Sequence, residues 1–170
     1  MSDIPFLNPT ILKQLDLPVP SREQTPQLLE PLNLNRPYEI NNREIQAYRR
    51  LYGFDKLPGE HWQGFISMPL FKLHVQVFKT QHSQIRGTVC LLHGYLEHSG
   101  IYQPIIKELL DQGFSVLTYD LPGHGLSDGS PANIQNFDHY QHVLHAVYQY
   151  TRQADQLPKP WVGIGQSTGG

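Results

Sequence analysis

The sequence has little of what marks several large protein classes. Its single cysteine, Cys90, excludes an internal disulfide and disfavours a thiolate metal cluster. No run of about 18 apolar residues occurs, and the N-terminus lacks a basic segment followed by an apolar stretch. These absences predict a cytoplasmic protein without a secretory leader or a membrane-spanning helix.

The sequence also lacks an excess of charge of either sign. Thirteen Lys and Arg against 15 Asp and Glu give a formal net charge of -2. Such a surface offers no strong electrostatic attraction to a phosphate backbone or to an anionic membrane. We therefore expect no nucleic-acid partner.

The chain divides into a proline-rich N-terminal extension, residues 1–60, and a patterned body, residues 61–170. Seven of the 14 prolines fall within residues 1–37, so neither a helix nor a strand can run far there. Residues 41–54 predict one helix docked on the body. Its expected cap and buried face are Asn41 or Asn42, Ile45, Tyr48, and Leu51 or Tyr52.

Short apolar segments in the body predict a sheet. Residues 62–68 and 71–78 predict an antiparallel hairpin, and strict alternation in the second indicates a half-buried strand with His74 facing solvent. Three continuously apolar runs are typical of parallel strands buried on both faces. These runs are residues 88–92, 114–119 and 161–164.

Two helical patterns separate these three runs. They span residues 102–113 and 136–153, with Gly113 closing the first helix. Their apolar stripes are Ile105, Ile106, Leu109 and Leu110 in the first, and Phe137, Tyr140, Leu144 and Val147 in the second. Strand, helix, strand, helix, strand predicts right-handed crossovers and an α/β fold whose sheet is mostly parallel.

Each of the three predicted parallel strands ends in a glycine-containing segment, where functional groups gather in such sheets. After the last strand, Gly165-Gln166-Ser167-Thr168-Gly169 matches the G-x-S-x-G nucleophile elbow. In an elbow, a tight turn between a buried strand and a helix lifts the serine hydroxyl clear of the sheet. Ser167 is therefore the candidate nucleophile, with Gly165 and Gly169 as supporting residues.

A second segment predicts an oxyanion hole. Acyl transfer builds negative charge on the former carbonyl oxygen, and two backbone N–H groups commonly stabilise it. One would belong to Thr168, the residue after the nucleophile. The other would belong to Tyr95 in the turn His93-Gly94-Tyr95, because Gly94 allows a close backbone approach.

Other motifs favour structural interpretations. The segment 120–129, with His124, is interpreted as structural and not catalytic. Residues 123–129 and 163–169 both read G-x-G-x-x-x-G, which is one residue longer than the dinucleotide-binding fingerprint, so they do not predict a nucleotide site. Steps of three residues drift around a helix, so no metal site is expected from His139, His142 and His145.

The three segments "LLHGYLEHSGIY", "YDLPGHGLSDG" and "GQSTGG" resemble the α/β-hydrolase superfamily, most closely its monoacylglycerol lipase and lysophospholipase branch, which also contains aminopeptidase-like members. The resemblance covers roughly residues 60–170, and it implies a tight strand-to-loop turn at Gly123, His124 and Gly125. Leu96 stands where the branch has the second glycine of H-G-x-G-E-H-S. Gln166 and Thr168 stand where it has His and Met in G-H-S-M-G.

The resemblance implies a serine hydrolase that cleaves lipid-type carboxylic esters, monoacylglycerol or lysophospholipid, through an acyl-enzyme at Ser167. It implies no metal and no organic cofactor. The expected partner is a small lipid ester, with transient contact at a membrane surface and no obligate protein partner. The alternatives are an aminopeptidase-like hydrolase of the same fold, or an inactive chain acting at most as an interaction module.

The partners of the nucleophile follow it in this fold, in the order Ser, Asp or Glu, His. Because the sequence stops at Gly170, we expect the triad acid and histidine to lie beyond it, and the fold to be truncated after the elbow.

Overall fold

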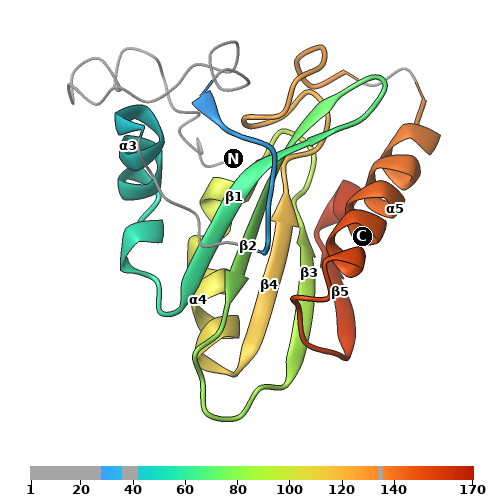
Figure 1. Ribbon diagram of the computed structural model, residues 1–170. Helices are drawn as coiled ribbons and strands as arrows, with labels where there is room; N and C mark the ends of the chain where they lie inside the picture. Colours follow the sequence, from blue (N-terminus) through green and yellow to red (C-terminus); the bar gives the residue numbers. More distant parts are fainter. Residues whose placement is uncertain (1–27, 36–41, 134–135) are drawn as a thin grey trace.

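A mixed sheet lies between two layers of helices in the computed structural model, which describes residues 28–35, 42–133 and 136–170 (Figure 1). Within these residues the sheet has five strands in the order β1-β2-β4-β3-β5. Their bounds are β1 Glu60–Ser67, β2 Lys72–Lys79, β3 Gly87–Leu92, β4 Phe114–Tyr119 and β5 Trp161–Gly165.

The helices cover both faces of the sheet. Helices α3 (Arg43–Leu51) and α4 (Gln103–Asp111) pack on one face, and α5 (Asp138–Gln153) packs on the other. Three short 3-10 helices complete the described elements, namely η1 (Phe54–Lys56), η2 (Ser99–Tyr102) and η3 (Ser167–Gly169). Two large hydrophobic cores result, one on each face of the sheet, and a smaller cluster of Leu29, Ile45 and Phe65 joins α3 to β1.

The strand directions confirm the predicted fold class. The hairpin of β1 and β2 is antiparallel, and β2 also pairs antiparallel with β4. Strand β3 pairs parallel with both β4 and β5, so the carboxyl ends of these three strands meet at one edge of the sheet. The predicted crossovers through α4 and α5 therefore bring the three glycine-containing segments together.

The helix predicted within the extension is confirmed as α3. The side chain of Asn42 caps it by accepting hydrogen bonds from the N–H groups of Glu44 at 2.8 Å and Ile45 at 3.2 Å. Ile45 and Tyr48 are buried against the body, as predicted. The helix is thus docked on the sheet.

Most of the proline-rich extension lies outside the described residues. Apart from residues 42–60, which include α3, its described part is residues 28–35, and these bury Leu32 and Leu34 in the core on the α5 side. A bridge between Pro31 and Phe65 joins this segment to the outer strand β1. The division of the chain at residue 60 stays a prediction.

The interpretation of β2 as half-buried, with His74 facing solvent, is wrong. His74 and Gln76 are fully buried, because α3 and η2 cover the face that the alternation assigned to water. The ring of Tyr48 on α3 lies edge-on to His74 at a centroid distance of 5.9 Å. Hydrogen bonds make this burial tolerable, since Gln76 donates to Ser99 Oγ at 2.8 Å.

The predicted apolar stripes of α4 and α5 need correction. On α4 only Ile106 and Leu110 are buried, and Ile105 is exposed. On α5 the buried residues are Val143, Val147 and Thr151. Phe137 precedes that helix and is 73% exposed, and Leu144 is partly exposed. The α5 stripe was misplaced because several sets of residues with helical spacing fit the same segment.

The prediction that β5 is buried on both faces is also wrong. Its side chains are largely exposed, with Val162 at 47% and Ile164 at 42%. Among the described residues, strand β5 stands last in the sheet order and pairs with β3 alone. The sheet therefore presents an apolar strand at this edge.

Candidate active site

The G-x-S-x-G segment forms a sharp turn directly after β5. Ser167 has φ of 51°, a left-handed conformation that is strained for a residue with a side chain. Two backbone hydrogen bonds close the turn, from Gly169 N–H to the carbonyl of Gln166 at 2.8 Å and from Gly170 N–H to that of Ser167 at 3.0 Å. This is the backbone geometry predicted for an elbow.

Crowding explains both glycines of this segment. A Cβ added to Gly165 would lie 1.9 Å from the carbonyl oxygen of Gly169. A Cβ added to Gly169 would lie 2.7 Å from the carbonyl oxygens of Leu92 and His93 at the end of β3. Real Cβ atoms do not approach this closely, so the turn needs glycine at both positions. The contacts of Gly169 place the elbow directly beside the turn that follows β3.

The turn His93-Gly94-Tyr95 lies beside the elbow. A Cβ on Gly94 would lie 2.9 Å from Glu97 Oε2 and 3.3 Å from the carbonyl oxygen of Gln166. The N–H of Gln166 donates to the carbonyl of Leu92 at 3.1 Å. Two of the sequence-predicted segments thus share one small region of backbone.

His93 is a buried support of this turn. Its Nε2 accepts a hydrogen bond from the N–H of Leu121 at 2.9 Å, so the ring proton is on Nδ1, which donates to the carbonyl of Gly94 at 2.8 Å. Burial lowers the pKa of His93, in agreement with a neutral ring. Both ring nitrogens are therefore engaged in holding the backbone.

Tyr95 and Thr168, the predicted donor residues, occupy different surroundings. The Tyr95 side chain is half exposed, and its hydroxyl donates to the carbonyl of Ala132 at 2.8 Å. Thr168 is half-buried in η3. Their backbone N–H groups belong to the two adjoining turns, and their role in the reaction stays a prediction.

Leu96 shows what the departure from the glycine pattern means physically. Its φ is 64°, in the region where glycine carries no steric penalty. Its side chain is 48% exposed, so little packing offsets that strain. Leu96 thus adopts a backbone conformation that favours glycine.

Asp120 organises the strand ends, and sequence reasoning missed its role. The fully buried carboxylate accepts hydrogen bonds from the N–H of Ser99 at 2.7 Å, the N–H of Leu126 at 2.9 Å and Nδ1 of His74 at 3.0 Å. Burial alone would raise the pKa of Asp120, but the hydrogen bond and the proximity of His74 hold it well below its usual range. A carboxylate directly after an apolar strand was the available signal.

The segment 120–129 is a tight turn, as predicted. Ser127 donates to the carbonyl of Asp120 at 2.6 Å, and the N–H of His124 donates to the carbonyl of Leu121 at 2.9 Å. The ring of His124 is buried and its Nδ1 lies 2.9 Å from the carbonyl oxygen of Pro122. These contacts support its structural interpretation.

The three histidines of α5 lie at different places. His139 and His142 border an apolar hollow beside residues 68–71, whereas His145 lines a second pocket together with residues of β5. The described part of the chain holds no group of three side chains that could bind a metal ion.

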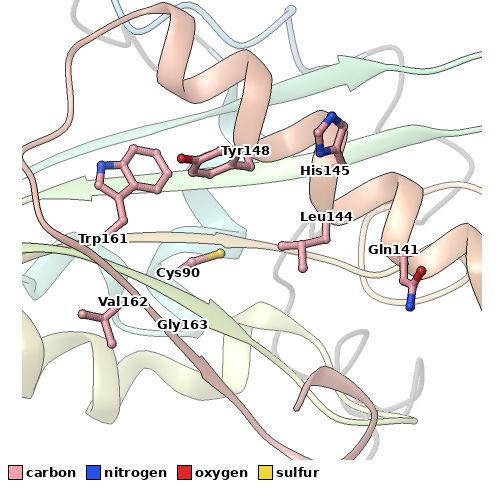
Figure 2. Close-up of a pocket in the computed structure, with 8 residues that line it drawn as sticks. All are labelled: Cys90, Gln141, Leu144, His145, Tyr148, Trp161, Val162 and Gly163. Carbon is pink, nitrogen blue, oxygen red and sulfur yellow. The ribbon is translucent and has the colours of Figure 1, made fainter.

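A pocket of about 520 Å³ lies between α5 and β5 (Figure 2). Its lining residues are Cys90, Gln141, Leu144, His145, Tyr148, Trp161, Val162 and Gly163. Burial raises the pKa of the Cys90 thiol to about 11, so this cysteine is a poor nucleophile. Ser167 does not line this pocket, so the pocket and the elbow are separate features of the described chain.

Comparison with known proteins agrees with this geometry. A family model described as serine aminopeptidase, S33, matches residues 83–170, which are 88 of the 170 residues. The matched segment contains all three glycine-containing strand ends. The described residues include no helix long and apolar enough to cross a membrane.

Two curated relatives are enzymes of ester chemistry by name. A caffeoylshikimate esterase from Arabidopsis thaliana is 30% identical over 110 residues, 64% of this chain and 33% of the relative. A monoacylglycerol lipase from Mycolicibacterium smegmatis is 29% identical over 91 residues, 54% of this chain and 32% of the relative. The matches thus span about a third of the length of these relatives.

A solved structure supports the fold. Est1E from Butyrivibrio proteoclasticus, with ferulic acid bound, superposes with a TM-score of 0.53 at 23% identity. The superposition covers 61% of this chain and 42% of that one. At this identity the likeness concerns the arrangement of the backbone.

Proposed function

Because the chain belongs to the serine aminopeptidase S33 family of hydrolases, we propose that its protein cleaves carboxylic esters of lipid type through an acyl-enzyme at Ser167. The observation that carries the proposal is the strained backbone of Ser167, held between two glycines and pressed against the His93-Gly94-Tyr95 turn. The esterase and lipase among the relatives support the ester class.

In the proposed reaction Ser167 Oγ bonds to the acyl carbon, and the bond from that carbon to the alcohol oxygen breaks. The hydroxyl proton of Ser167 ends on the departing alcohol, and water then releases the acid. The N–H groups of Tyr95 and Thr168 would stabilise the transient oxyanion. His93 cannot act as the base, since both its ring nitrogens bind the backbone. In this fold the base and its acid follow the nucleophile.

A fluorophosphonate probe and an ester assay test this proposal. The wild-type protein should be labelled on the peptide that contains Ser167 and should hydrolyse a monoacylglycerol. Ser167→Ala should abolish labelling and reduce kcat by about a millionfold, the loss typical of a removed serine nucleophile. Ser83→Ala, at an exposed serine remote in sequence, should retain both activities. Turnover unchanged in Ser167→Ala would contradict the assignment.

An aminopeptidase-like activity is the second candidate, because the matching family model bears that description. An aminoacyl-nitroanilide beside a monoacylglycerol in the same assay separates the two. Faster cleavage of the ester supports the lipid-ester proposal, and faster cleavage of the nitroanilide supports the aminopeptidase. A cytoplasmic location and a transient membrane contact remain predictions.

A further inference from the structure

Three polar side chains from separate segments meet between the turn and the elbow. They are Glu97 after the turn, Tyr102 at the end of η2 and Gln166 at the elbow. Tyr102 Oη lies 2.5 Å from Glu97 Oε2 and 2.9 Å from Gln166 Oε1. Gln166 Nε2 donates to Glu97 Oε1 at 3.4 Å. The three groups therefore form a closed triangle.

The triangle is tied directly to the backbone of the predicted oxyanion hole. Glu97 Oε2 accepts a hydrogen bond from the N–H of Gly94 at 2.9 Å, and the N–H of Glu97 donates to the carbonyl of Gly94 at 3.2 Å. Gly94 immediately precedes Tyr95, whose N–H is the proposed donor. A shift of Glu97 would therefore displace the peptide next to that donor.

The chemistry of the three groups suits one carboxylate surrounded by hydrogen-bond donors. Tyr102 has one hydroxyl proton for two neighbouring oxygens, and the charged carboxylate is the stronger acceptor. The neutral amide of Gln166 directs its NH2 group to the other carboxylate oxygen, Glu97 Oε1. Tyr102 itself is 5% exposed, and burial together with its hydrogen bond to Glu97 raises its pKa to about 12, so it stays a donor.

We propose that Glu97, Tyr102 and Gln166 form a tether that positions the backbone of Gly94, next to the Tyr95 N–H, against the elbow. The three are positioning residues, because they act on the oxyanion hole through the backbone. The effect of the tether on turnover rests on the proposed hydrolase function, whereas its effect on folding does not. A second carboxylate at position 166 should therefore break the tether in a pH-dependent way.

Gln166→Glu tests this, because it removes the amide donors and places a like charge beside Glu97. Like charges this close raise the pKa of one carboxyl in the folded protein above its unfolded value near 4.3. Such a carboxyl is neutral at acid pH, and the protein loses stability as the pH rises through the pKa of that carboxyl in the folded state. The unfolding temperature of Gln166→Glu should thus fall progressively below that of the wild type between about pH 4 and pH 8.

Matched variants make the readout specific. Combining Glu97→Gln with Gln166→Glu exchanges the amide and the carboxylate, and should restore the wild-type pH dependence. Gln112→Glu is the control. Gln112 is exposed, as Gln166 is, and donates to Glu108 at 3.1 Å, but this pair lies at the end of α4, outside the turn and the elbow. Its unfolding temperature should follow the wild type at all pH values.

Turnover gives the second readout on the same proteins. From pH 5 to pH 8 the kcat of Gln166→Glu relative to the wild type should fall about 10- to 100-fold, as for a misplaced oxyanion donor, with KM nearly unchanged. A Gln166→Glu unfolding profile parallel to the wild type overturns the tether even in an inactive protein. A shifted unfolding profile with an unshifted kcat ratio overturns its positioning role. Absence of wild-type labelling and turnover overturns the hydrolase proposal instead.

Discussion

Replacing Asp120 with Asn tests whether one buried carboxylate holds the strand ends together. The carboxylate receives three donors at 2.7 to 3.0 Å and is fully buried. An asparagine offers one oxygen and one NH2, so at least one donor, such as the N–H of Ser99, would face another donor. Losing a hydrogen bond to a charged group costs about 1.5–3 kcal/mol, and an unsatisfied buried donor costs about 1–3 kcal/mol more.

Together these effects predict that Asp120→Asn lowers the free energy of unfolding by about 3–5 kcal/mol, the range for breaking a buried charged pair. This is a large share of the roughly 5–15 kcal/mol of a typical domain. Urea unfolding followed by tryptophan fluorescence measures it. Asp111→Asn is the control, since Asp111 pairs with Lys107 on the exposed side of α4 and should change stability far less.

The pH dependence gives the prediction a second test. A carboxyl whose pKa is depressed in the folded protein contributes stability that is present above its unfolded pKa near 3.9 and is lost as pH falls through the folded pKa. The difference between wild type and Asp120→Asn should therefore be constant near neutral pH and shrink below about pH 4. If Asp120→Asn and Asp111→Asn unfold at the same urea concentration at pH 7, the reasoning is refuted.

Two further substitutions test the backbone of the site. Gly169→Ala should destabilise the protein by about 1–3 kcal/mol through overpacking, since the new Cβ would lie 2.7 Å from two carbonyl oxygens. Gly163→Ala is the control and should leave stability unchanged, because no atom lies within 4 Å of its new Cβ. Equal urea midpoints for the two variants would contradict the crowding at Gly169. Leu96→Gly relieves about 1–2 kcal/mol of left-handed strain against about 0.5–1 kcal/mol of added chain entropy, so its unfolding temperature should hold or rise. Leu70→Gly is the control, at a 67% exposed residue without positive φ, and should lower the unfolding temperature. An equal decrease in the unfolding temperature of Leu96→Gly would argue against backbone strain at Leu96.

The strands and the elbow could be predicted because their signals are local. Continuous apolar runs identified β3 and β4 as buried strands, and the crossover helices then required parallel pairing. Gly165 is required by contacts within a few residues, and Gly169 by contacts with the end of the adjoining strand β3. The positive φ of Ser167 follows from the same turn.

The polar interior of β2 could not be predicted from its own residues. Alternation of apolar and polar side chains is typical of a strand with one face in water, and His74 and Gln76 fitted it. Only the docking of α3 and η2 decided that this face is covered. The polar groups then remain buried because partners from distant segments, Ser99 and Asp120, reach them.

The sequence by itself determined the order of the elements, the fold class and the position of the elbow, since periodicity and glycine spacing act over a few residues. Tertiary structure decided which polar groups meet. Asp120 gathers donors from residues 46 positions before it to six after it. Glu97 reaches Gln166 across 69 positions. Such contacts depend on how strands and helices pack in space, and no local pattern encodes them.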